Sequence, residues 1–186
     1  TFATPDLTWE KTSQIDVGID LSLAGVNISF DWFRKDTEDL LFQKQVPLYN
    51  GGGKYWVNQG AIKNEGYEFS LNTFVIDRAV KWETTANVTY IKNEVVDLAG
   101  DDFHLTANYS DLGGEMQIMK PGYPLGSFYV YDWAGFDDNG ANLYRKADGS
   151  LTTAPTAADR IIRGCASPKW MVGWNNTIIW RNLSIN

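Results

Sequence analysis

The chain carries few of the side chains that usually perform chemistry on a substrate. His104 is its only histidine and Cys165 its only cysteine. Catalytic schemes of the Ser-His-Asp or Cys-His type, and metal sites built from several histidines, therefore lack parts. We expect His104 to lie in a loop, either exposed or packed, and Cys165 to be a small buried apolar residue without a disulfide partner.

Carboxylates are the remaining candidates for chemistry. The pairs Asp101-Asp102 and Asp137-Asp138 supply the two groups that a glycosidase needs. Both pairs lie in polar stretches, where aspartate commonly stabilises turns. The sequence DDNG, which begins at Asp137, resembles the start of a calcium loop but lacks the bidentate glutamate that closes one. We expect a plain turn there and leave calcium binding near Asp137 open.

Composition narrows the class of protein. Hydrophobic residues make up 44% of the chain, charged residues 21% and aromatic residues 14%, with eight tryptophans. These values exclude a disordered chain, and no apolar run approaches the roughly 20 residues of a transmembrane helix. They leave open a membrane β-barrel, whose strands are short and only half apolar. The net charge of −7 disfavours nucleic-acid binding, and the glycine triplet at 51–53 lacks the lysine of a phosphate-binding loop.

The strongest structural signal is the alternation of apolar and polar residues between residues 13 and 33. A period of two predicts strands, because successive side chains leave a strand on opposite faces. Two such runs, joined by the short Ala24-Gly25 turn, predict a β-hairpin. The apolar set comprises Ile15, Val17, Ile19, Leu21, Leu23, Val26, Ile28, Phe30 and Trp32. This face could contact either another protein layer or lipid.

The same pattern predicts an all-β fold of antiparallel strands. We expect strands at about residues 13–23, 26–33, 66–76, 80–91 and 169–180, with long loops at 34–60 and 92–168. Asn176 interrupts the apolar phase of the last strand. The alternation of short turns with long loops is typical of up-and-down strands in an outer-membrane barrel with long external loops. Aromatic residues near the predicted strand ends would then form interfacial girdles: Trp9, Phe30, Trp32, Phe33, Trp82, Tyr90, Trp170 and Trp180.

Four stretches of sequence carry a family resemblance. They are PDLTWEKTSQIDVGID from residue 5, LFQKQVPLYNGGGKYWVNQGAIKNEGYEFSLN from residue 41, KPGYPLGSFYVYDWAGFDDNGANLY from residue 120 and DRIIRGCASPKWMVGWNNTIIWRNLSI from residue 159. In this order they resemble the SusC/RagA-like TonB-dependent outer-membrane transporters of Bacteroidetes. The spacing of Asn58, Gly60, Asn64, Gly66 and Glu68 belongs to this match. Val130 and Trp174 depart from the residues that are common in the family.

The resemblance implies that residues 1–186 are part of one transmembrane β-barrel domain, in its later half. Family barrels have roughly 22 strands, so the predicted strands form only a partial barrel, without the plug domain. The resemblance implies a bacterial outer-membrane protein that imports oligosaccharides or peptides, with no enzymatic activity and no cofactor. It also implies three partners: a SusD-like surface lipoprotein, TonB through the absent plug domain, and outer-membrane lipid.

Two sets of residues are the expected functional contacts. Polar side chains on the strands would line the barrel interior or contact the plug: Asp16, Asp20, Asn27, Asp31, Glu68, Asn72, Glu83 and Asn87. The loop aromatics Tyr49, Tyr55, Trp56 and Tyr109 could stack on a bound sugar or peptide, although packing among loops would explain them equally. The alternative function is a soluble β-rich carbohydrate-binding or adhesin module, and a β-sheet hydrolase is a third reading.

The alternation makes a prediction for two adjacent residues. In the full-length protein in bilayers, a nitroxide label replacing Ile19 should be relaxed by oxygen, which partitions into lipid. A label replacing Asp20 should be relaxed by a water-soluble nickel complex. The reason is that neighbouring side chains of a barrel strand face opposite media. If both labels report a tightly packed protein interior, the soluble module is the correct reading.

Overall fold

A computed structural model describes residues 6–45, 49, 51–109 and 114–186 of the chain. The chain divides into two compact units, which are described separately. Unit 1 comprises Thr1–Asn93 with Pro168–Asn186, and unit 2 comprises Glu94–Ser167. Among the described residues no helix is long and apolar enough to span a membrane. The fold is all-β with antiparallel strand pairs, as the sequence predicts.

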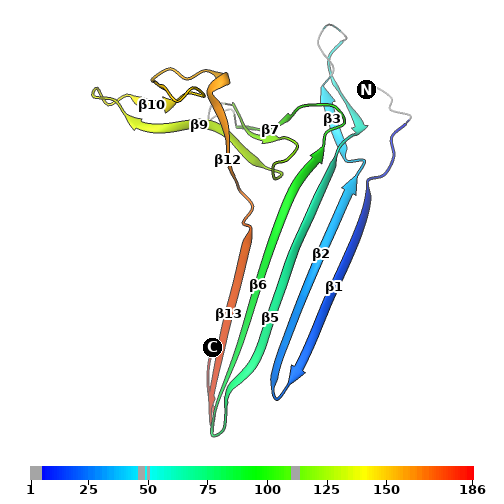
Figure 1. Cartoon of the computed structure of the whole chain (residues 1–186), viewed down its shortest axis with the longest axis vertical. Helices are drawn as coiled ribbons and strands as arrows, with labels where there is room; N and C mark the ends of the chain where they lie inside the picture. Colours follow the sequence, from blue (N-terminus) through cyan, green and yellow to red (C-terminus); the bar gives the residue numbers. More distant parts are fainter. Residues whose placement is uncertain (1–5, 46–48, 50, 110–113) are drawn as a thin grey trace. The chain divides into compact units, whose positions relative to one another are not determined.

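Unit 1 is built on a six-stranded sheet whose strands lie side by side in the order of the sequence (Figure 1). The sheet strands are β1 (Lys11–Leu23), β2 (Val26–Glu38), β5 (Ala61–Asp77), β6 (Val80–Asp97), β13 (Trp170–Trp180) and β14 (Leu183–Ile185). β2 pairs antiparallel with β1, β5 with β2, β13 with β6 and β14 with β13, and β6 lies next to β5, so the sheet is a meander. A small ribbon of β3 (Leu41–Gln45) and β4 (Lys54–Asn58) is inserted between the second and third strands of the sheet.

Tight turns join the strands at one end of this sheet. Ala24 and Gly25 connect β1 to β2 with φ angles of 50° and 84°, the paired positive values that a two-residue hairpin turn requires. Residues 78–79 connect β5 to β6. The long connections, which contain the β3–β4 ribbon and the strands of unit 2, leave from the opposite end, because the strands alternate in direction.

Several strands extend beyond their predicted limits. β2 continues to Glu38, β5 begins at Ala61 and β6 reaches Asp97, whereas the sequence pattern placed these residues in loops. Most of the added residues are charged or polar, as in the Arg34–Glu38 stretch, and the few apolar ones are too short a run to show a period. The expected loop 34–60 also contains the β3–β4 ribbon, and the expected loop 92–168 contains six strands.

Within the described residues of unit 1, no second sheet covers either face of the six-stranded sheet. The buried hydrophobic residues among those described are Val95, Leu98, Ile118 and Met119, which all belong to unit 2. Every residue of β1 is exposed, and Ile19 retains 60% of its accessible surface. The sheet therefore exposes a continuous apolar side that a soluble domain would bury.

Glycines allow two side chains to lie flat across neighbouring strands. A Cβ atom on Gly66 would overlap the carbonyl oxygen of Tyr90 and would lie 2.8 Å from Cζ of Phe33. The Phe33 ring therefore occupies the space above Gly66, its partner in the β2–β5 register. Asp31 similarly occupies the space above Gly18. Phe33 thus faces the side opposite to Trp32, and its expected place in an aromatic girdle is wrong.

Unit 2 folds around a second, smaller sheet. Its order is β11-β10-β9-β8-β7, with β12 paired to β9. A short 3-10 turn at Ala157–Asp159 precedes β12, and the backbone N–H and hydroxyl of Thr156 donate hydrogen bonds of 2.8 Å to Asp159. These bonds lower the pKa of the Asp159 carboxyl. The strands are β7 (His104–Tyr109), β8 (Gly114–Met119), β9 (Ser127–Phe136), β10 (Asn142–Arg145), β11 (Leu151–Thr152) and β12 (Arg160–Cys165).

The space above Gly66 provides a stability test. Replacing Gly66 by alanine should destabilise the protein by about 1–3 kcal/mol, because the added methyl group displaces Phe33 and presses on the backbone of β6. Gly173 is the matched control: it also lies in a sheet strand, and its Cβ would have no atom within 4 Å. Thermal unfolding, followed by the gel shift of heated samples, measures both variants. Equal unfolding temperatures for the two would contradict the packing described.

Candidate functional site

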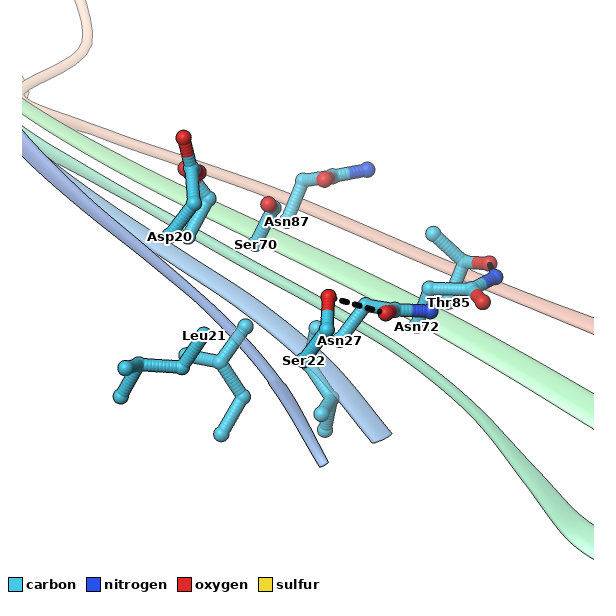
Figure 2. Close-up of a pocket in the computed structure, with 11 residues that line it drawn as sticks. Asp20, Leu21, Ser22, Asn27, Ser70, Asn72, Thr85 and Asn87 are labelled. Atoms are coloured by element: carbon cyan, nitrogen blue, oxygen red, sulfur yellow. Dashed lines mark hydrogen bonds between the residues drawn. The ribbon is translucent and has the colours of Figure 1, made fainter. Parts of the chain in front are cut away.

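The predicted interior residues share one side of the unit 1 sheet, here called the polar face. The β1–β2 register pairs Asp20 with Ser29, and the β2–β5 register pairs Asp31 with Glu68. Figure 2 shows Asp20, Ser70 and Asn87 on one side of the strands and Leu21 on the other. The shared set is Asp16, Asp20, Asn27, Asp31, Glu68, Asn72, Glu83 and Asn87.

A shallow trough of about 440 Å³ lies on the polar face near the tight turns. Its hydrogen bonds run across strands: the Ser22 hydroxyl donates to Asn27 Oδ1 at 2.8 Å, and Asn72 Nδ2 donates to Glu83 Oε1 at 2.8 Å. The same amide lies 2.9 Å from Thr85 Oγ1. Serine, threonine and amide side chains line the rest of the trough: Ser29, Ser70 and Asn87. Such a surface can hydrogen-bond water or a polar solute in many arrangements.

The polar face is strongly acidic. Asp31 and Glu68 are direct cross-strand partners, an arrangement that costs energy when both are ionised. Asp16 accepts bonds of 3.0 Å from the amide of Gln14, and Asp31 accepts one of 3.1 Å from the hydroxyl of Ser29. Within the described part of the chain, neither aspartate forms an ion pair. The face carries the carboxylates of Asp16, Asp20, Asp31, Glu68 and Glu83 against the ammonium groups of Lys35 and Lys81, so its net charge is negative.

The opposite side of the sheet, here called the apolar face, carries a ladder of aromatic rings across four strands. Phe30 stacks on Tyr67 with ring centroids 6.0 Å apart, and Tyr67 stacks on Tyr90 at 6.5 Å. Tyr90 packs against Trp170 at 4.7 Å. These rings, with Phe69 and Val88, line a groove of about 450 Å³. Aromatic rings gathered at one level of an apolar sheet are typical of a membrane–water interface.

Beyond these rings the same face becomes charged. Arg34 Nε lies 2.8 Å from Asp36 Oδ2, and the Glu65 carboxylate lies 3.8 Å from the ammonium groups of both Lys63 and Lys92. Lys92 is two residues beyond Tyr90, and Arg34 is two beyond Trp32. The apolar face thus changes from aromatic rings to charged side chains over two residues along β2 and β6. This change marks the level where an apolar medium would meet water.

The apolar band has the dimensions of a bilayer core. It runs from the Trp170–Tyr90 pair to the Trp180–Val80 pair of the β6–β13 register. Ten steps of about 3.3 Å give a strand length of about 33 Å. At the roughly 40° tilt of barrel strands, this corresponds to a height of about 25 Å, the height of the apolar band in outer-membrane barrels.

Asn176, which interrupts the alternation in sequence, lies on the apolar face with a specific partner. Its Oδ1 accepts a bond of 3.1 Å from the indole N–H of Trp82. The indole N–H of Trp174 donates at 2.9 Å to Thr84 Oγ1, again between β6 and β13. Asn176 and Thr84 therefore each satisfy an indole donor that hydrocarbon could not. The sequence signal for this arrangement is that Trp82 lies two positions before Thr84 in β6, and Trp174 lies two positions before Asn176 in β13.

The loop aromatics are not gathered into one cluster in unit 1. Tyr55 and Trp56 are consecutive residues of β4, so their rings leave the ribbon on opposite faces. Tyr49 is 86% exposed. Tyr109 belongs to β7 in unit 2, and its side chain lies outside the described residues.

The residues that the sequence offered as candidates for catalysis or metal binding have structural roles, as far as the structure describes them. Asp137 Oδ1 accepts bonds from the backbone N–H groups of Asn139 and Ala141 at 2.9 and 2.7 Å, which makes residues 137–141 a side-chain-stabilised turn. The prediction that Cys165 is buried is wrong: the residue is half-buried, and its Sγ lies 3.2 Å from the carbonyl oxygen of Leu125. His104 begins β7, and its side chain is not among those described. In the described residues no group of three His, Cys, Asp or Glu could hold a metal ion.

The Trp82–Asn176 bond predicts an energetic coupling between two strands that are distant in sequence. In a double-mutant cycle of Trp82→Phe and Asn176→Ala, the coupling free energy should be about 0.5–1.5 kcal/mol, because either substitution alone leaves a polar group without its partner. Equilibrium urea unfolding of the full-length protein in micelles measures it. The control cycle pairs Asn176→Ala with Trp180→Phe, which share no hydrogen bond. A coupling no larger than that of the control cycle would contradict the assignment.

Known proteins match the chain in sequence and in structure. The family described as "TonB dependent receptor-like, beta-barrel" matches residues 1–172. TonB-dependent receptor P3 of Formosa agariphila is 33% identical over the whole chain, which covers 20% of that relative. TonB-dependent receptor SusC of Bacteroides thetaiotaomicron is 31% identical over 79% of the chain, covering 16% of SusC.

The solved structure of the RagAB peptide importer in its closed-closed state covers 99% of the chain with a TM-score of 0.86 and 26% identity. The chain covers 21% of that structure's chain, so it spans about a fifth of the length of these relatives. The relatives are receptors and transporters of the outer membrane rather than enzymes. The chain belongs to the TonB-dependent receptor β-barrel family and forms part of an outer-membrane barrel of the SusC type.

Proposed function

We propose that the chain is the part of a TonB-dependent transporter that forms a section of its barrel wall, and that the whole protein imports oligosaccharides or peptides across the outer membrane. In this proposal the apolar face of unit 1 contacts lipid. The polar face lines the interior or contacts a plug domain outside this segment, and TonB supplies the energy through that plug.

The observation that carries the proposal is the uncovered two-sided sheet of unit 1. One face is apolar over about 25 Å and ends in rings and then charges, as at Tyr90 and Lys92. The other face is acidic and amide-rich, as at Asp20 and Asn72. Lipid on one side and an aqueous passage on the other satisfy both faces at once.

The soluble carbohydrate-binding or adhesin module is the weaker alternative. A soluble β-sandwich buries one face of each sheet against the other. In unit 1, however, Ile19, Leu23 and Val172 on the apolar face are 60%, 80% and 71% exposed. A water-soluble protein with such a face would aggregate.

Substrate and surface partner are inferred from the relatives. RagAB is described as a peptide importer, and SusC and the Formosa proteins as TonB-dependent receptors. Both oligosaccharide and peptide therefore remain candidate cargo. A SusD-like lipoprotein would be the surface partner, and Tyr49, Tyr55, Trp56 and Tyr109 would contact the ligand from the external side.

Uptake by living cells tests the proposal. Deleting the gene should reduce uptake of either fluorescently labelled oligosaccharides or labelled peptides by at least about tenfold, because molecules of this size do not cross the barrier by themselves. The full-length gene should restore uptake in a TonB-dependent manner, and a lipoprotein should co-purify. A matched control is a strain that lacks an unrelated outer-membrane barrel. A protein found in the soluble fraction, or unchanged uptake of both classes, would refute the proposal.

A further inference from the structure

An exposed aromatic pair stands apart from the sites described above. Trp133 and Phe136 lie near the end of β9 in unit 2 and are 55% and 64% exposed. Their ring centroids are 5.4 Å apart and their planes meet at 80°. The two exposed rings form a right-angled pair, here called the aromatic corner. Large rings held together in water are costly unless a ligand covers them.

A β-bulge creates this corner. Side chains three positions apart in a regular strand point to opposite faces. In β9 the register with β10 shifts between the Gly135–Leu143 pair and the Trp133–Tyr144 pair, and Gly135 adopts a φ of 117°, where other residues are strained. The extra residue brings Trp133 and Phe136 to the same side. Bulges that re-aim side chains are found next to binding sites.

Hydrogen bonds hold the corner in place before any ligand arrives. The indole N–H of Trp133 donates to Asn142 Oδ1 at 3.0 Å, which fixes the plane of the ring. The turn between β9 and β10 is fixed by Asp137 through its bonds to Asn139 and Ala141. Asn142 is exposed, and its amide NH₂ group has no protein partner among the described residues. A preorganised surface of this kind loses little conformational entropy on binding.

The chemistry of the corner favours a sugar ring. A pyranose presents a flat face of C–H bonds, whose positive hydrogens suit the negative face of an indole, and hydroxyl groups at its rim. The amide of Asn142 can donate a hydrogen bond to such a hydroxyl. An apolar peptide side chain requires walls on several sides to lose its water, and two rings at a right angle do not supply them.

We propose that the aromatic corner of Trp133 and Phe136 binds a pyranose ring of an oligosaccharide, with Asn142 contacting its hydroxyls. This inference rests on the proposed transport function and makes oligosaccharide, rather than peptide, the cargo recognised by unit 2. Trp133 is the stacking residue, Phe136 forms the second wall, and Gly135 is a positioning residue that acts through the bulge.

Calorimetric titration of the purified full-length protein tests the site. The probes are maltoheptaose, cellohexaose, xylohexaose and mannohexaose. At least one probe should bind the unmodified protein, and Trp133→Ala should weaken that binding about tenfold, the loss expected for one aromatic stacking contact. Trp133→Phe should retain most of the affinity, because it keeps an aromatic face.

A second pair of variants separates geometry from general backbone damage. Gly135→Ala should weaken sugar binding about as much as Trp133→Ala, because it strains the bulge while both rings remain. Gly149→Ala is the control, since Gly149 also has a positive φ, 85°, in another turn of unit 2. It should leave binding unchanged.

Three outcomes would overturn the inference. They are no binding of any probe to the unmodified protein, equal binding by Trp133→Ala, or equal losses from Gly135→Ala and Gly149→Ala. Uptake measurements distinguish these from failure of the proposed function. A protein that imports peptides and binds none of the sugars keeps its transport role and loses this site.

Discussion

The fold of unit 1 depends on one constraint: as far as the structure describes it, its large sheet has no buried hydrophobic core, so each face must contact a medium that suits its side chains. The strands of unit 1 pair through their backbones, and among the described residues of this unit no second layer packs on either face. Such a sheet is stable only if the medium differs on its two sides, since Ile19 and Val172 require a medium without water and Asp20 and Asn72 require water. The six strands leave backbone groups unpaired at both edges, so they depend on further strands in the whole barrel.

The alternation of apolar and polar residues was sufficient to predict the sheet, because the media on its two sides differ and successive side chains face opposite sides. β1 reads as Ile15, Val17 and Ile19 against Asp16 and Asp20, and the structure places these sets on opposite faces. The same rule failed where the medium is water on both sides. Beyond Trp32 and Tyr90 the strands continue, but no hydrophobic period remains to mark them. The β3–β4 ribbon and the strands of unit 2 escaped prediction because most of these strands are short, so even where a residue such as Ile118 is buried no clear period of two emerges.

The positions of some side chains could not be predicted from the sequence pattern alone. Phe33 was grouped in sequence with the aromatics at strand ends, although its place next to Trp32 puts it on the polar face, and the structure shows its ring over Gly66. Asn176 reads as an error in the pattern, and only its indole partner, Trp82, explains its presence on the apolar face. Trp133 and Phe136 come together through a bulge, and a pattern with a period of two cannot contain one. The eight polar-face residues were identifiable because periodicity alone decides their side.

The pairing of β6 with β13 has a consequence for how the protein folds. Tyr90 and Trp170 are neighbours across the sheet, yet all of unit 2 lies between them in sequence. Closing so long a segment costs chain entropy, which slows pairing of strands far apart in sequence. If unit 2 folds first, the flexible loop that must be closed becomes much shorter, and β13 can then pair with the free edge of β6. The inserted unit would then act during biogenesis as an internal assembly aid, long before any nutrient reaches the mature barrel.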